Sequence, residues 1–150
     1  MKMINIRLGL DVGSTTVKLV ALNFSYDIVY SVYKRHYSDV KNCVKEVLMD
    51  AYKRFKNEVV SIMVTGSGGL AVHKWLQIPF IQEVVASTTA IRKFIPETDV
   101  AIELGGEDAK ITYLSGNIEQ RMNSICAGGT GAFIDQMASL LETDAEGLNR

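Results

Sequence analysis

One stretch of this sequence occurs twice in recognisable form, and the repetition limits the folds open to the chain. Residues 11–22 read D-V-G-S-T-T-V-K-L-V-A-L, and residues 103–114 read E-L-G-G-E-D-A-K-I-T-Y-L. The matching positions are an acid, a glycine and a lysine in each copy: Asp11, Gly13 and Lys18, then Glu103, Gly105 and Lys110. Apolar positions follow in step, which predicts a strand, a turn and a second strand in each copy. A duplicated domain explains the match; two ordinary β-hairpins remain the alternative.

The rest of the chain alternates expected strands with expected helices. Besides the second hairpin, the strands cover 4–12, 16–24, 27–37, 59–65 and 117–124, and the helices cover 40–56, 69–76, 83–95 and 128–142. The helix over 40–56 has an apolar stripe that includes Cys43. Because free cysteine is often a small buried hydrophobe, we interpret Cys43 as a core residue.

This order of elements indicates an α/β fold. Residues 96–99, P-E-T-D, end one apolar-periodic segment directly before a new strand, so a domain boundary is expected there. We expect a first domain over residues 1–97 and the start of a second, incomplete domain over residues 98–150.

Composition excludes several classes of protein. The net charge of -1 and the lack of a basic patch argue against a partner that is nucleic acid or an anionic membrane. The short basic run at residues 34–36 is interpreted as a solvated strand end. No apolar run approaches membrane-spanning length, and two cysteines are too few for a disulfide scaffold. We therefore expect a soluble cytoplasmic protein.

The two turns have the chemistry of a phosphate-binding site. Glycines and small hydroxyl residues let backbone N–H groups approach phosphate oxygens, and a lysine adds a positive charge. The residues expected to contact a nucleotide are Gly13, Ser14, Thr15, Thr16 and Lys18 in the first turn, and Gly105, Gly106 and Lys110 in the second. Two such hairpins facing each other would clamp a triphosphate, and phosphoryl transfer needs mostly positioning and charge neutralisation.

Asp11 ends the strand before the first turn. A carboxylate at this place can hold Mg²⁺ through water, because Mg²⁺ prefers oxygen ligands and keeps several waters. The alternative for Asp11 is a turn-capping aspartate, and the alternative for each lysine is a solvated strand residue.

The stretch N-S-I-C-A-G-G-T-G-A-F, residues 123–133, sets Cys126 before a glycine-rich turn. Glycines at the start of a helix form an anion site, although a tight strand-to-helix turn is the alternative. The residues expected to contact the nucleotide here are Gly128, Gly129, Thr130 and Gly131. Cys126 could be a nucleophile, a metal ligand or a small buried residue. A helix N-terminus favours its thiolate, whereas a nucleophile needs a neighbouring base, and neither His36 nor His73 has a visible link to it.

These motifs together resemble a known family. The turns resemble the phosphate motifs of the actin, Hsp70 and sugar-kinase superfamily, which implies a duplicated ribonuclease-H-like fold. The whole chain resembles the BadF/BadG/BcrA/BcrD-type ATPases, and within them the activators of 2-hydroxyacyl-CoA dehydratases. The segments that match the family's motifs are Asp11–Thr15, Thr65–Gly68, Glu103–Lys110 and Cys126–Asp135.

The resemblance implies cofactors and a partner. It implies a homodimer that binds ATP or ADP with Mg²⁺ and holds one 4Fe–4S cluster between its subunits. Cys126 matches the first cluster ligand of each subunit, and the second ligand is expected beyond residue 150. ATP hydrolysis would then drive a low-potential electron into the partner dehydratase.

Three departures from the family's pattern bear on catalysis. Glu107 stands where the family has a glutamine, and we expect Asp11 and Glu107 to be the catalytic residues, with the Glu107 carboxylate orienting the attacking water. Glu103 replaces a strand-end aspartate, so its carboxylate reaches one methylene further. Residues 82–86, Q-E-V-V-A, lack a Cys and a His found in many activators.

The resulting hypothesis is an ATPase that activates an acyl-CoA dehydratase by electron transfer. Two alternatives remain open: a small-molecule kinase of the same superfamily, and a nucleotide-binding module without enzymatic activity.

Overall fold

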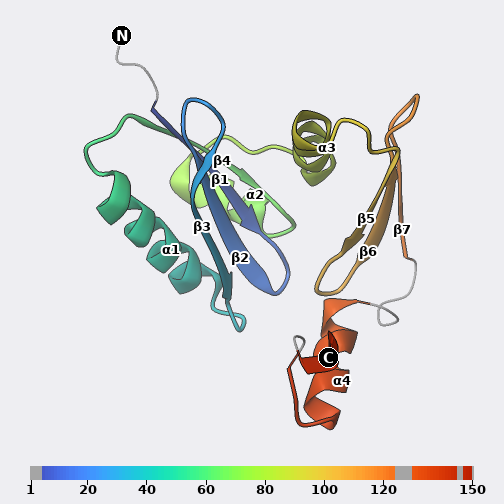
Figure 1. Ribbon diagram of the computed structural model, residues 1–150. Coiled ribbons are helices and arrows are strands. Elements are labelled where there is room, and N and C mark those ends of the chain that lie inside the picture. The colour runs from blue at the N-terminus through green and yellow to red at the C-terminus, as the bar shows by residue number, and fades with distance from the viewer. Residues whose placement is uncertain (1–4, 124–129, 145–146, 150) are drawn as a thin grey trace. The chain divides into compact units, whose positions relative to one another are not determined.

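The chain folds into two compact units, one within residues 1–86 and the other within residues 87–150. Figure 1 shows the computed structural model, which describes residues 5–123, 130–144 and 147–149. The two units divide between residues 86 and 87, which is earlier than residue 97. The domain boundary that the sequence suggests near residue 97 stays a prediction.

A four-stranded sheet forms the centre of the first unit. Its strands are β1 (Ile6–Val12), β2 (Thr16–Leu22), β3 (Ile28–Arg35) and β4 (Val60–Thr65), in the order β3-β2-β1-β4. The first three strands form an antiparallel meander, and β4 runs parallel to β1. Because β1 and β4 are parallel, their carboxyl ends reach the same edge of the sheet, where the first turn begins.

The core of this unit lies between the sheet and the two helices α1 (Val40–Phe55) and α2 (Gly69–Leu76). Alternate residues of β1 and β2 point into it: Leu10, Val12, Val17 and Leu19. Helix α1 begins at an N-cap, Asp39, whose carboxylate accepts a hydrogen bond from the Asn42 N–H at 3.3 Å. Cys43 is a core residue, as predicted, and its burial raises the pKa of its thiol.

The second unit contains an antiparallel three-stranded sheet. Helix α3 (Glu83–Phe94) leads to the strands β5 (Val100–Leu104), β6 (Ala109–Tyr113) and β7 (Glu119–Met122), which lie in the order β5-β6-β7. Helix α4 (Gly131–Leu140) and a short 3-10 helix (Gly147–Asn149) follow. Each meander is thus followed by a helix, α1 in the first unit and α4 in the second.

The two hairpins share their strand register. Asp11 lies opposite Lys18 in the β1–β2 pair, and Glu103 lies opposite Lys110 in the β5–β6 pair. The acid and the lysine that align in the sequence are therefore direct cross-strand neighbours in both copies. This agreement favours the duplication over two unrelated hairpins. No helix in the described parts of the chain is long and apolar enough to cross a membrane.

Candidate functional site

The same backbone hydrogen bond closes both predicted phosphate turns. In the first turn the Gly13 N–H donates to the Thr16 carbonyl at 2.9 Å, and in the second the Gly105 N–H donates to the Asp108 carbonyl at 2.7 Å. A Cβ atom at Gly105 would come within 3.0 Å of the Asp108 carbonyl oxygen, so a side chain fits poorly there. The turns match in hydrogen bonding as well as in sequence.

Each turn also carries an ion pair between its aligned acid and lysine. The Lys18 Nζ lies 2.9 Å from Asp11 Oδ2, and the Lys110 Nζ lies 3.8 Å from Glu103 Oε1. The first pair joins the acid predicted to hold magnesium to a lysine predicted to contact phosphate, and Lys110 of the second pair is also a predicted phosphate contact. The structure therefore brings these residues together in each turn, and their contacts with a nucleotide stay a prediction.

The second turn is also the base on which α4 begins. The Gly131 N–H donates to the Gly105 carbonyl at 2.8 Å, and the Ala132 N–H donates to the Gly106 carbonyl at 2.9 Å. In this conformation the Gly131 amide is engaged by the turn, so a phosphate would have to compete for it. Thr130, the N-cap of α4, is fully buried. The other predicted residues of this stretch, Cys126, Gly128 and Gly129, lie outside the described residues.

Asp11 divides its two carboxylate oxygens between neighbouring strands. Oδ2 pairs with Lys18 on β2, whereas Oδ1 is covered and has no hydrogen-bond partner. Thr65 on β4 is the parallel register partner of Asp11. Its hydroxyl oxygen is also covered and has no hydrogen-bond partner. Gly66 comes next in the chain with φ +91°, and a Cβ atom there would overlap Asp11 Oδ1. Two unsatisfied oxygens therefore lie at the joint end of β1 and β4.

These oxygens are suitable for a hydrated magnesium ion. Among the described residues no three His, Cys, Asp or Glu side chains form a group able to hold a metal. Magnesium held through water at one carboxylate needs no such group, because it retains most of its own hydration shell. An unsatisfied buried oxygen also gains free energy when it finds a partner. The donor set at Asp11 thus fits Mg²⁺.

His36 is a contact of the first turn that the sequence analysis missed. It is buried, and its Nε2 lies 3.3 Å from the Gly13 carbonyl oxygen. The interpretation of residues 34–36 as a solvated strand end is therefore wrong for His36. Strand alternation contained the signal: Tyr30 and Val32 pack on the core, Lys34 pairs with Glu46 of α1, and His36 is the next residue on this face.

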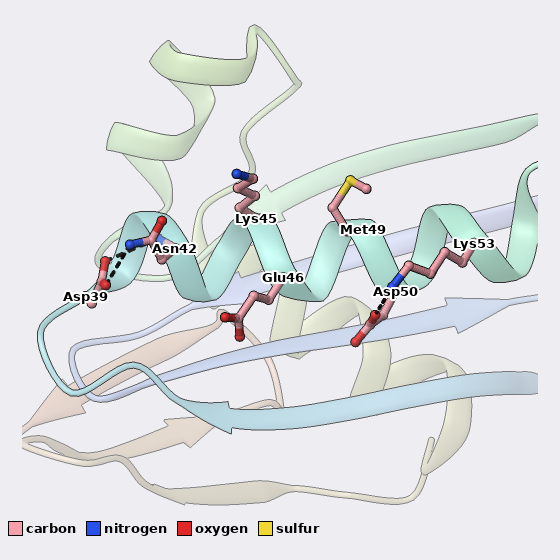
Figure 2. A pocket seen from close by; sticks show the side chains of 7 residues that line it. All are labelled: Asp39, Asn42, Lys45, Glu46, Met49, Asp50 and Lys53. Atoms are coloured by element: carbon pink, nitrogen blue, oxygen red, sulfur yellow. Dashed lines mark hydrogen bonds and ion pairs between the residues drawn. The ribbon is translucent and has the colours of Figure 1, made fainter.

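The remaining predicted residues differ in exposure. Ser14 and Glu107 are exposed, so their side chains are accessible to a ligand, whereas Thr16 is buried. A hollow of about 630 Å³ lies along α1. Figure 2 shows the side chains that line it: Asp39, Asn42, Lys45, Glu46, Met49, Asp50 and Lys53. None of the predicted site residues lines it. Asn42 pairs with Asp39 and Lys53 pairs with Asp50 along the helix, whereas Glu46 pairs with Lys34 of β3, so we interpret this face as solvated.

Comparison with known proteins assigns the family. The sequence profile of the BadF/BadG/BcrA/BcrD ATPase family matches residues 8–149. The chain belongs to this family. It is 33% identical over 146 residues to the 2-hydroxyisocaproyl-CoA dehydratase activator of Clostridioides difficile, and the match covers 94% of this chain and 54% of that protein. It is 29% identical to the (R)-2-hydroxyglutaryl-CoA dehydratase activating ATPase of Acidaminococcus fermentans, over 94% of this chain and 55% of that protein.

Solved structures of family members share the fold. Component A of the (R)-2-hydroxyglutaryl-CoA dehydratase of Acidaminococcus fermentans has a TM-score of 0.77 at 28% identity, with coverage of 96% of this chain and 57% of that one. The activator from Clostridium difficile with bound ADPNP has a TM-score of 0.77 at 30% identity, with coverage of 97% and 55%. The fold is therefore α/β and ribonuclease-H-like, as predicted. The chain spans about half the length of these relatives.

Proposed function

We propose that this protein acts as an ATP-hydrolysing activator of a 2-hydroxyacyl-CoA dehydratase and works in the cytoplasm. The observation that carries the proposal is the pair of matching turns, each with a cross-strand acid and lysine, in a chain similar over nearly its whole length to named activators. Phosphoryl transfer requires positioned amides, cations and a held water, and the two turns offer residues for each task.

The roles of the residues follow from their places. Backbone amides of the two turns would bind the phosphates, and Lys18 and Lys110 would add positive charge. Asp11 would hold Mg²⁺ through water, supported by its unpartnered Oδ1. Glu107 is exposed within the second turn, where its carboxylate would orient the water that attacks the terminal phosphate.

The iron–sulfur part of the proposal rests on Cys126, which would be one ligand of a 4Fe–4S cluster shared by two subunits. Such a cluster supplies a low-potential electron, and four thiolates normally hold it. Asn123 and Gly131, which lie on either side of Cys126 in the chain, are both hydrogen-bonded to the second hairpin. On one side the Asn123 N–H donates to the Ala109 carbonyl at 3.0 Å, and on the other the Gly131 N–H donates to Gly105. Movement of this turn would therefore reach both ends of the segment, as coupling requires.

The test combines hydrolysis and iron binding on the full-length protein. We expect Mg·ATP hydrolysis, and after anaerobic reconstitution we expect iron and sulfide in the wild type that the Cys126→Ala variant lacks. Equal iron and sulfide in both proteins would refute the cluster. Phosphate transfer to a small molecule would instead identify a kinase, and binding without turnover would identify a nucleotide-binding module.

A further inference from the structure

His36 lies outside the predicted phosphate turn, and all four of its polar groups make hydrogen bonds: the backbone N–H, the backbone carbonyl and the two ring nitrogens. Its backbone N–H donates to the Thr15 carbonyl at 3.2 Å, and its own carbonyl accepts from the Asp39 N–H at 2.7 Å. Its ring Nδ1 accepts from the Ser38 N–H at 3.2 Å, and its Nε2 lies 3.3 Å from the Gly13 carbonyl oxygen. This residue therefore joins the first turn to the start of α1.

The hydrogen bonds specify the ring's tautomer. Because Nδ1 accepts a backbone N–H, it carries no proton, and the ring proton of neutral His36 is on Nε2. Nε2 therefore donates to the Gly13 carbonyl. The chain adopts left-handed backbone at Tyr37 (φ 45°) and Ser38 (φ 68°), which non-glycine residues seldom adopt, next to the Ser38 N–H that reaches Nδ1.

These bonds orient the amides of the turn. The described peptide bonds include no cis bond, and in a trans peptide the N–H points opposite to the carbonyl. Fixing the Gly13 carbonyl on His36 therefore turns the Ser14 N–H away from His36. In the same way, fixing the Thr15 carbonyl turns the Thr16 N–H away from β3 and into the turn.

The direction of these amides is the one a phosphate needs. His36 continues the face of β3 that carries Tyr30 and Val32, and these two residues pack against the core that contains Leu10 and Val12. Side chains alternate along a strand, so Asp11 lies on the opposite face, together with its cross-strand partner Lys18. The Ser14 N–H thus faces the side of the sheet that carries the predicted magnesium acid and lysine.

We propose that His36 is a positioning residue for nucleotide binding: it holds the carbonyls of the first turn so that the Ser14 and Thr16 amides are directed at a phosphate. The inference rests on the proposed function, and it assigns part of that function to a residue that does not touch the nucleotide. A rival role is purely structural, in which His36 only closes the connection from β3 to α1.

Two substitutions separate the positioning role from the structural one. The His36→Asn variant places an acceptor near Nδ1, so it keeps the bond from Ser38 and loses the bond to Gly13. The His36→Gln variant places a donor near Nε2, so it keeps the bond to Gly13 and loses the bond from Ser38. Binding of Mg·ADPNP by calorimetry should be about tenfold weaker in His36→Asn, the effect of one lost hydrogen bond, and largely recovered in His36→Gln.

The controls make each outcome decisive. His73, whose Nδ1 lies 2.6 Å from the Ile78 carbonyl oxygen, is the matched histidine away from the turn, and His73→Asn should bind as the wild type does. Wild-type affinity in a folded His36→Asn protein would overturn the inference. If the wild type binds no Mg·ADPNP, the proposed function itself is refuted. If His36→Asn does not fold, hydrogen exchange of the wild-type amides is the test. Mg·ADPNP should slow exchange of the Ser14 and Thr16 amides. Unchanged exchange at these amides would overturn the inference.

Discussion

Replacing Thr65 by valine should make the nucleotide-free protein more stable. The Thr65 hydroxyl is covered and has no hydrogen-bond partner at the end of β4. Valine has nearly the same shape and is equally suited to a strand, so the Thr65→Val substitution removes the unsatisfied oxygen and adds a methyl group. Most substitutions of partly buried residues lower the free energy of unfolding, so a gain is a specific expectation.

The size of the gain follows from the cost of an unmade hydrogen bond. Leaving a buried donor or acceptor unsatisfied costs about 1–3 kcal/mol. The residue as a whole is only partly buried, so the lower end of this range applies. We therefore expect the free energy of unfolding to rise by about 1 kcal/mol, which raises the melting temperature by about 2–4 °C for a chain of this size.

Thr112 is the matched control. It is also a strand threonine, but its hydroxyl accepts a hydrogen bond from Gln120 Nε2 at 3.0 Å. The Thr112→Val variant should therefore lose about 1 kcal/mol, because the Gln120 amide loses its acceptor. Urea unfolding curves of the two variants, measured without nucleotide, should move in opposite directions. A loss of stability in Thr65→Val would refute the reasoning, since it would mean that the hydroxyl has a partner.

Three further predictions concern single residues. The Asp11→Ala variant should lose Mg·ATP binding, and unchanged calorimetric binding would contradict the site assignment. The Gly66→Ala variant should lower the free energy of unfolding by at least about 2 kcal/mol, because φ is +91° and the new Cβ overlaps Asp11 Oδ1; a denaturation midpoint equal to wild type would contradict this. In a Cys126→Ser background Cys43 should react slowly with Ellman's reagent until the protein is unfolded, because burial covers the thiol and raises its pKa. The raised pKa favours the protonated thiol in the folded state, so its contribution to stability is complete below the unfolded pKa and is lost as pH rises through the folded value.

The hairpins could be predicted from sequence because their signals are local. Alternating apolar residues and a short turn specify a hairpin without help from the rest of the chain. The ends of the strands are predicted less accurately, because side-chain hydrogen bonds near the turns end the strands. Strand β2 ends at Leu22 rather than residue 24 because Asn23 Oδ1 accepts the Asp27 N–H at 2.9 Å and forms a local turn.

The hydrogen bonding of the site could not be predicted in the same way. The role of His36 depends on its distance to Gly13, which lies 23 residues earlier in the chain. The engagement of the Gly131 amide by Gly105 likewise depends on how α4 docks on the second turn. Residue types and spacing can indicate that a turn suits a phosphate, but only the folded chain determines which amides are already occupied.

The cross-strand pairs of acid and lysine have a consequence for how the site binds an anion and a cation together. Without ligand, Lys18 neutralises Asp11, and Lys110 lies beside Glu103. An anion that enters the first turn competes with Asp11 Oδ2 for Lys18, and a cation held at Oδ1 competes with Lys18 for the charge of the same carboxylate. Either event frees the group that the other needs, so each ion should raise the affinity of the site for the other by the same factor. A site built in this way accepts a neutral pair of ions more readily than either ion alone.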